Sequence, residues 1–156
     1  MVLLGLVVGL GLGCGARRSQ SASAPFVVGA LGSGWESASA GGADLAWYNA
    51  SLMATIYADA NCKKRRDDST LSDSMHHLTA GLRAGAPLRE EALRLANRDA
   101  LLRVYEVTLD GVPLTLGAVV LNKDDCSYDM VYLAPRLRFD AGWADFVGLV
   151  SGFEGR

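Results

Sequence analysis

Apolar and polar residues alternate along several parts of the chain, which is the pattern of half-buried β-strands. From Leu52 to Ala58 every second residue is apolar, and successive side chains of a strand point to opposite faces of a sheet. The apolar stretch 45–48 precedes this segment and is separated from it by the turn formers Asn49, Ala50 and Ser51. The pattern therefore predicts a β-hairpin over residues 45–58.

The second half of the chain predicts three consecutive antiparallel strands. Residues 101–109 are rich in Val, Leu and Tyr and end at Asp110–Gly111, the strongest short hairpin signal, because both residues tolerate positive φ. The return strand covers 112–120 in the same alternating pattern. A charged turn then leads into 126–134, which Pro135 ends.

Two segments have helical spacing. Thr70 and Asp73 fit the capping-box pattern, and apolar residues recur every three or four positions until Gly85, which predicts a helix over about 71–83. Asp140 is a suitable N-cap for a closing helix near the end of the chain. The apolar stripe of that second helix consists of Trp143, Phe146, Val147 and Val150.

Residues 88–95 (LREEALRL) fit two structures. Glu90 and Arg94 are spaced as a helical i,i+4 pair, whereas Leu93 and Leu95 alternate with charges as in a strand. Local sequence slightly favours the helix. Taken together, the elements predict an α+β fold, an antiparallel sheet of about five to six strands covered by helices.

The first residues resemble a bacterial lipoprotein signal. Residues 1–13 are apolar and uncharged, and Cys14 follows them directly. This run is shorter than the roughly 20 residues that cross a membrane as a helix, but it fits the apolar region of a secretory signal. The segment resembles a lipobox, although Gly11 stands where leucine is typical. The resemblance implies removal of residues 1–13 and acylation of Cys14, with a cleaved secreted protein as the alternative.

Composition then divides the remaining chain. Residues 14–43 are rich in Gly, Ala and Ser and are expected to form a flexible tether, in which only Phe26–Leu31 has the pattern of a short strand or docking segment. A single domain is expected over 44–156. Half of the residues are hydrophobic and the net charge is -2, so a sizeable core is expected and a nucleic-acid partner is not.

Cysteine usage fits a location outside the cytosol. Once Cys14 is acylated, Cys62 and Cys126 remain, and two thiols in an oxidising compartment favour a disulfide. Two buried free thiols are the alternative. His76 and His77 are adjacent and miss the apolar stripe of the first predicted helix, so they are expected at the surface. No metal site or cofactor is predicted.

Asp129 is the polar residue that most needs an explanation. It lies in the middle of a predicted strand, on the face that carries Val131 and Leu133, and a buried carboxylate needs a cation or a raised pKa. Arg103, on the apolar-leaning face of a nearby strand, is the candidate partner. A structural ion pair or an exposed Asp129 is expected, and a ligand-binding site with Asp129 and Arg103 is the alternative.

Four segments resemble a group of uncharacterised bacterial lipoproteins whose domain is similar to the PsbP and DcrB-like α/β/α sandwich. The segments are ATIYADANC (54–62), TLSDSMHHLTAGL (70–82), LDGVPLTLGAVVLNKDDCSYDMVYLAP (109–135) and RFDAGWADFVGLVSGF (138–153). The resemblance implies this sandwich fold for residues 44–153 and makes 88–95 a strand. It transfers no catalytic residue.

The expected function is therefore a non-enzymatic binding or accessory module in the cell envelope. The partners expected are the membrane, through the lipid on Cys14, and an unidentified envelope protein or small ligand. Because Gly15 is not the Asp that favours inner-membrane retention in many bacteria, the periplasmic face of the outer membrane is preferred. A small-molecule-binding or weakly catalytic protein, with a pocket near Asp129, Arg103, Tyr128 and Tyr132, is the alternative.

Overall fold

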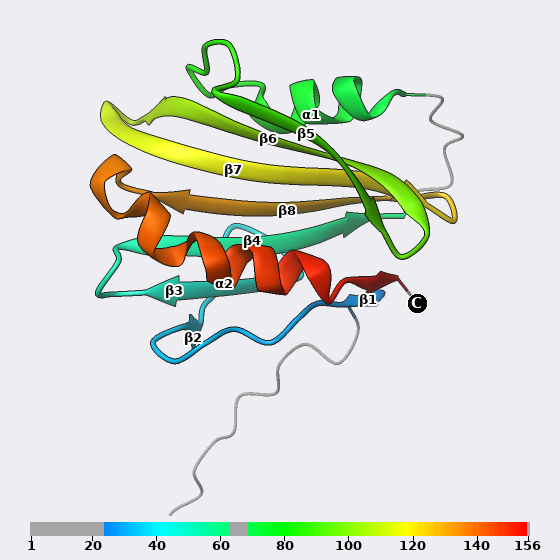
Figure 1. Ribbon diagram of the computed structural model, residues 1–156, viewed down its shortest axis with the longest axis horizontal. Coiled ribbons are helices and arrows are strands. Elements are labelled where there is room, and N and C mark those ends of the chain that lie inside the picture. Colours follow the sequence, from blue (N-terminus) through cyan, green and yellow to red (C-terminus); the bar gives the residue numbers. More distant parts are fainter. Residues whose placement is uncertain (1–23, 63–68, 156) are drawn as a thin grey trace, which may run out of the picture.

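A seven-stranded antiparallel sheet forms the centre of the protein (Figure 1). The computed structural model describes residues 24–62 and 69–155. The spatial order of the strands is β2-β3-β4-β8-β7-β6-β5, and each neighbouring pair is antiparallel. The strands are β2 (Glu36–Ser37), β3 (Leu45–Asn49), β4 (Ala54–Asn61), β5 (Arg89–Leu95), β6 (Arg98–Leu109), β7 (Val112–Lys123) and β8 (Cys126–Ala134).

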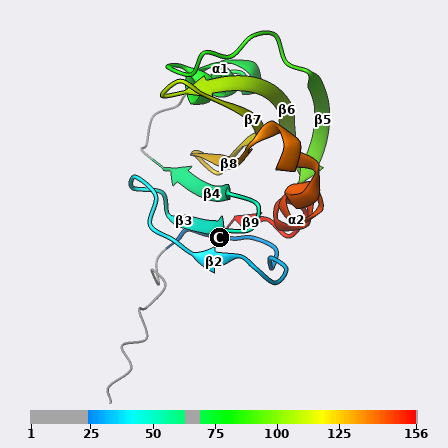
Figure 2. The ribbon, with the colours of Figure 1, turned by 90° about the vertical axis from the view of Figure 1, so that its left-hand side faces the viewer.

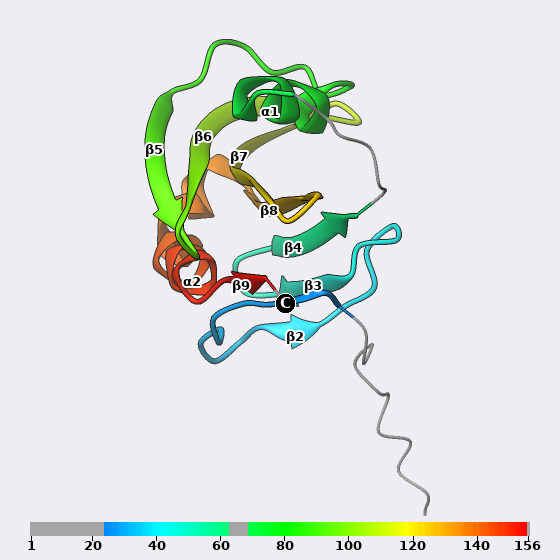
Figure 3. The same cartoon turned by 90° about the vertical axis from the view of Figure 1, so that its right-hand side faces the viewer.

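The two α-helices cover opposite faces of this sheet (Figures 2 and 3). Helix α1 (Leu71–Thr79) lies on one face with Met75 in its core, and α2 (Phe139–Ser151) lies on the other with Phe146 in its core. A short 3-10 helix, η1 (Arg136–Arg138), precedes α2. The two cores alternate along each strand, as the period of two requires. The predicted α+β sheet covered by helices is confirmed.

The predicted hairpins are present with the predicted turn chemistry. Strands β3 and β4 pair from Leu45↔Ala58 to Asn49↔Ala54. In the β6–β7 hairpin, Asp110 has φ 49° and Gly111 has φ 82°, the left-handed pair that matches the twist of the flanking strands. The sheet has one strand more than the five to six predicted, because the short β2 extends one of its edges.

Strand β5 resolves the two structures open for residues 88–95 in favour of the strand. It pairs with β6 from Arg89↔Val104 to Leu95↔Arg98. The connecting turn consists of Ala96 and Asn97, both with left-handed φ, so the local helical spacing of charges is overridden by a tight hairpin. Tertiary pairing thus decides a segment whose pattern fits both periods.

Both helices begin or end differently from the prediction. Helix α1 has the predicted capping box of Thr70 and Asp73 but ends at Thr79, because the chain turns at Ala80 and Gly81, the latter with φ 91°. Helix α2 begins at Phe139, so the predicted N-cap residue Asp140 lies within its first turn. The basic 3-10 turn already brings the chain into helical geometry there.

The buried stripe of α2 is also shifted from the prediction. Phe146 and Val150 are buried as expected, whereas Val147 is 40% exposed and Leu149 takes its place in the core. The buried residues of this helix are Phe139, Gly142, Phe146, Leu149 and Val150. Gly142 allows close packing here, since a Cβ on it would meet the hydroxyl of Tyr132.

The described part of the predicted tether packs against the domain, so the predicted boundary near residue 44 lies too late in the chain. Strand β1 (Phe26–Val27) pairs with β9 (Glu154–Gly155), and Phe26 is 2% exposed within the core under α2. The backbone N–H of Gly29 donates to the carbonyl of Leu149 at 2.9 Å. The Gly- and Ser-rich composition concealed this docking, because the segment has only a few apolar side chains, among them the buried Phe26.

Candidate functional site

A disulfide joins Cys62 and Cys126, confirming the predicted pair. Cys62 directly follows Asn61 and Cys126 directly precedes Ser127, the residue that pairs with Asn61, and the Cα atoms of the two cysteines are 4.1 Å apart. The bond therefore fastens the end of β4 to the start of β8. It closes a loop with a sequence separation of 64 residues. Cys14, the predicted lipidation site, lies outside the described residues.

Asp129 lies opposite another carboxyl group rather than opposite a cation. On β8 it is directly paired with Asp59 of β4, on the sheet face that α1 covers. Asp44, just before β3, is close enough to Asp59 to share a hydrogen bond with it, and its carboxylate accepts from the N–H of Ala60 at 3.0 Å. Three carboxyl groups thus gather at one end of β4.

Burial and mutual repulsion disfavour the charged forms of this group. Burial, followed by the charge of Asp59, raises the pKa of Asp129 to about 6. Burial and then Asp44 raise the pKa of Asp59. The phenol of Tyr57 lies beside them, and burial and then Asp129 raise its pKa as well. Asp129 is therefore the group most able to bind a proton near pH 6 in this cluster.

Arg103 is held elsewhere, so the expected ion pair with Asp129 is wrong. Its Nε donates to Glu90 at 2.6 Å, and its Nη2 donates to the hydroxyl of Ser72 at 3.2 Å. Arg103 and Asp129 share a sheet face, but β7 separates their strands. Alternation alone placed both on that face, whereas the strand order, which the sequence pattern does not specify, separates them.

The two tyrosines of the expected pocket lie on the opposite face of the sheet. Tyr128 and Tyr132 are 2% and 0% exposed, within the core under α2. The hydroxyl of Tyr132 donates to the carbonyl of Phe139 at 2.9 Å, and burial raises its pKa to about 12. These rings pack the core. They do not converge with Asp129 or Arg103 on a common cavity.

A shallow groove with a volume of about 370 Å³ lies between β6 and the start of α2. It was not predicted from the sequence. The guanidinium of Arg89 lies 5.7 Å from the centre of the Trp143 ring, within the range of a cation–π contact. Residues that line the groove include Leu88, Arg89, Glu106, Arg136, Phe139 and Trp143.

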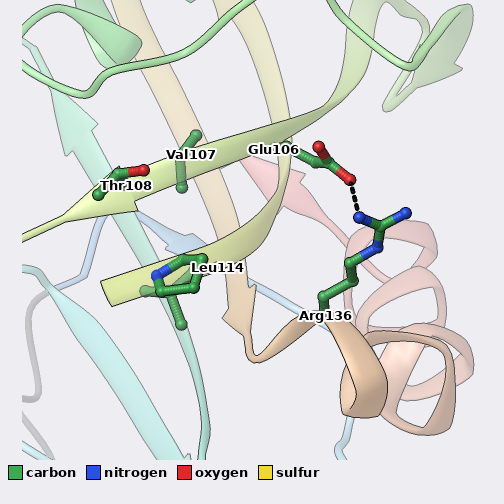
Figure 4. Close-up of a pocket in the computed structure, with 6 residues that line it drawn as sticks. Glu106, Val107, Thr108, Leu114 and Arg136 are labelled. Carbon is green, nitrogen blue, oxygen red and sulfur yellow. Dashed lines mark ion pairs between the residues drawn. The ribbon is translucent and has the colours of Figure 1, made fainter. Parts of the chain in front are cut away.

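The groove continues into a smaller hollow at the β6–β7 hairpin, shown in Figure 4. Arg136 and Glu106 lie in both openings and form an ion pair at 2.9 Å, with Val107, Thr108 and Leu114 beside them in the smaller one. Two guanidinium groups, two aromatic rings and exposed apolar surface can bind a mixed polar and apolar group. The signals in the sequence were Trp143 and the strand assignment of 88–95, which together bring Arg89 over the helix.

His76 and His77 lie at the surface of α1 as predicted, both exposed. Among residues 24–62 and 69–155, no group of three or more His, Cys, Asp or Glu side chains is arranged so that it could hold a metal ion. In the same part of the chain no helix combines the length and the apolar character that membrane crossing requires.

Comparison with known proteins identifies the fold. No family model matches the sequence, and no curated protein matches it either. Cyanobacterial PsbP (CyanoP) from Synechocystis sp. PCC 6803 superposes with a TM-score of 0.56 at 15% identity, covering 80% of this chain and 83% of that one. The chain has a PsbP-like fold. At this level of identity the likeness concerns architecture only.

Two further solved structures match the chain over most of its length. LpqN of Mycobacterium tuberculosis, which is involved in cell envelope biogenesis, matches with a TM-score of 0.58 at 9% identity, covering 82% of this chain and 81% of that one. A protein of Bacteroides thetaiotaomicron VPI-5482 matches with a TM-score of 0.61 at 10% identity, covering 85% of this chain but 45% of its own. The PsbP-like fold implied by the sequence resemblance is thus confirmed.

Proposed function

We propose that this protein is a bacterial envelope lipoprotein, anchored to the membrane by a lipid on Cys14 and carrying a PsbP-like accessory domain in the periplasm. The domain binds another envelope component and performs no catalysis. The outer membrane is the proposed location, because Gly15 follows the acylated cysteine. Acyl chains contribute about 0.8 kcal/mol per buried CH₂, so the domain itself need not enter lipid.

The distribution of the three cysteines supports this proposal most strongly. Cys62 and Cys126 are joined to each other, and such disulfides form and persist outside the reducing cytosol. The third cysteine, Cys14, stands directly after the apolar segment 1–13. Export accounts for the bridged pair, and acylation accounts for the remaining cysteine at its lipobox-like position.

The geometry near Asp129 supports an accessory role over the small-molecule alternative. That alternative requires Asp129, Arg103, Tyr128 and Tyr132 to converge, and they lie on two faces of the sheet. The involvement of LpqN, a protein with this fold, in cell envelope biogenesis is compatible with the proposed compartment.

Membrane fractionation tests the proposal. The wild-type chain, a Cys14→Ser variant and a Cys62→Ser/Cys126→Ser variant are expressed in a bacterium that exports lipoproteins, and membranes are washed with high salt. We expect the wild type and the disulfide variant in the membrane fraction and Cys14→Ser in the soluble periplasm. Equal partition of Cys14→Ser and wild type would contradict the anchor. Cross-linking in intact cells then tests binding, which fails if no specific partner is retrieved.

A further inference from the structure

Strand β5 is an open edge of the large sheet. It is the last strand in the order, and no described strand pairs with its outer side. Figures 2 and 3 show β5 at the rim of the molecule, with β6 as its inner neighbour. A seven-residue edge with unpaired backbone groups is a template on which another strand can pair.

The hairpin turn determines which residues of β5 direct their backbone groups outward. A two-residue turn of left-handed residues, here Ala96 and Asn97, is closed by a pair that exchanges both hydrogen bonds, here Leu95 and Arg98. Because inward and outward directions alternate along a strand, the outward groups belong to Glu90, Ala92 and Arg94. All three residues are exposed.

The charges on this outward series are self-complementary. We propose that β5 pairs antiparallel with β5 of a second copy of this chain, with Ala92 facing Ala92 across a two-fold axis. In this register Glu90 of each copy faces Arg94 of the other, and all three outward residues meet in hydrogen-bonded pairs. The opposite-charge pair therefore occurs twice in one dimer.

Other symmetric registers that pair the outward groups are less favourable. Centring the axis on Glu90 or on Arg94 places like charges face to face, which is destabilising. Centring it on Glu91 or Leu93 brings the outward residues together without any Glu–Arg pair.

The existing ion pairs extend the complementarity within each copy. Glu90 is bound to Arg103 at 2.6 Å, and Arg94 to Asp99 at 3.1 Å. Pairing in the proposed register therefore joins these ion pairs into one row of alternating charge. The row runs from Arg103 and Glu90 of one copy to Arg94 and Asp99 of the other. A network of this kind is more effective than the isolated exposed pairs from which it is assembled.

A charge exchange tests both the dimer and its register. Glu90→Arg and Arg94→Glu are made in the full chain carrying Cys14→Ser, with the disulfide intact, and the dissociation constant is measured by sedimentation. Each variant alone places like charges face to face twice, so we expect the dissociation constant to rise on the order of tenfold. An equimolar mixture pairs unlike charges again and should form a mixed dimer with about the original affinity.

Loss of folding in either variant cannot produce rescue on mixing, so a mixed dimer supports the register. Failure of the mixed dimer to form between two variants that circular dichroism shows to be folded would overturn the register. A cysteine cross-link gives an independent readout in the same background. The Cα atoms of facing residues in a hydrogen-bonded pair are about 5.5 Å apart, a Cα–Cα distance that a disulfide can span. Ala92→Cys should therefore form a covalent dimer under mild oxidation. Ser37→Cys, on the exposed edge strand β2, is the control. Equal cross-linking of both variants would overturn the proposal.

Discussion

Replacing Asp129 with Asn tests the electrostatic account of the carboxyl cluster. The pKa of Asp129 is raised from an ordinary value of 3.8 to about 6 by burial and then by Asp59. Asn is nearly isosteric with the protonated acid and carries no charge. We therefore expect Asp129→Asn to stabilise the folded protein wherever the wild type must hold a charged Asp129.

The magnitude follows from linkage between proton binding and folding. Between pH 3.8 and about 6 the Asp129 carboxyl binds more protons in the folded state than in the unfolded chain. The contribution of Asp129 to wild-type stability therefore falls as pH rises through this interval and is constant above it. At 1.36 kcal/mol per pH unit, the interval corresponds to roughly 3 kcal/mol. Because the partly buried site can relax, we expect a gain of about 1–3 kcal/mol for Asp129→Asn at pH 8 and almost none at pH 4.

Urea unfolding followed by circular dichroism at both pH values measures this gain, with the disulfide kept intact. Asp99→Asn is the matched control, since Asp99 lies on the same sheet with a side chain that is 80% exposed. A gain for Asp129→Asn that is equal at pH 4 and pH 8, or a destabilisation at pH 8, would refute the reasoning.

Three further predictions concern packing and the disulfide, each measured as a change in the free energy of unfolding. Gly142→Ala should cost about 1–3 kcal/mol because its methyl group meets a buried tyrosine hydroxyl, whereas Gly148→Ala on the same helix has open space and should be neutral or stabilise by up to about 1 kcal/mol. Equal effects would contradict the packing of α2. Phe26→Ala should cost about 3–5 kcal/mol. A negligible cost would indicate that the stable domain begins near residue 44, as the sequence predicted. Cys62→Ser/Cys126→Ser should lower the free energy of unfolding by about 4 kcal/mol on the chain-entropy model. An unchanged urea midpoint of unfolding would contradict this prediction.

The local elements were predictable from the sequence where one residue type has a strong backbone preference. Asp110–Gly111 marks a hairpin because few residues tolerate two consecutive left-handed conformations. Thr70 and Asp73 mark the start of α1 because their side chains bond the free N–H groups there. Such signals act within a few residues and survive in any tertiary context.

The candidate site was less predictable because it depends on strand order. The face of Asp129 followed from alternation, but its neighbour on that face did not. The sheet places β4 on one side of β8 and β7 on the other, so Asp59 faces Asp129 and Arg103 does not. Long-range pairing of this kind is set by the packing of the whole sheet rather than by any short segment.

The docking of residues 24–43 was concealed for a related reason. A Gly- and Ser-rich composition is typical of a tether, and Phe26 is the buried residue of this segment, with Val28, Leu31 and Trp35 packed against the same core. Glycine contributes by allowing backbone approach between Gly29 and α2, which no hydrophobic pattern reveals. The groove beside Trp143 was missed because its two halves come from β5 and α2, more than 40 residues apart in the sequence.

The lipid anchor on Cys14 can be tested by the intact mass of the protein purified from membranes under non-reducing conditions. We expect a chain that begins at Cys14 and carries a diacylglyceryl or triacyl addition that is lost in Cys14→Ser. We also expect its mass to be lower by the two hydrogens removed when Cys62 and Cys126 join. An unmodified Cys14 on a chain that still carries residues 1–13 would contradict the anchor.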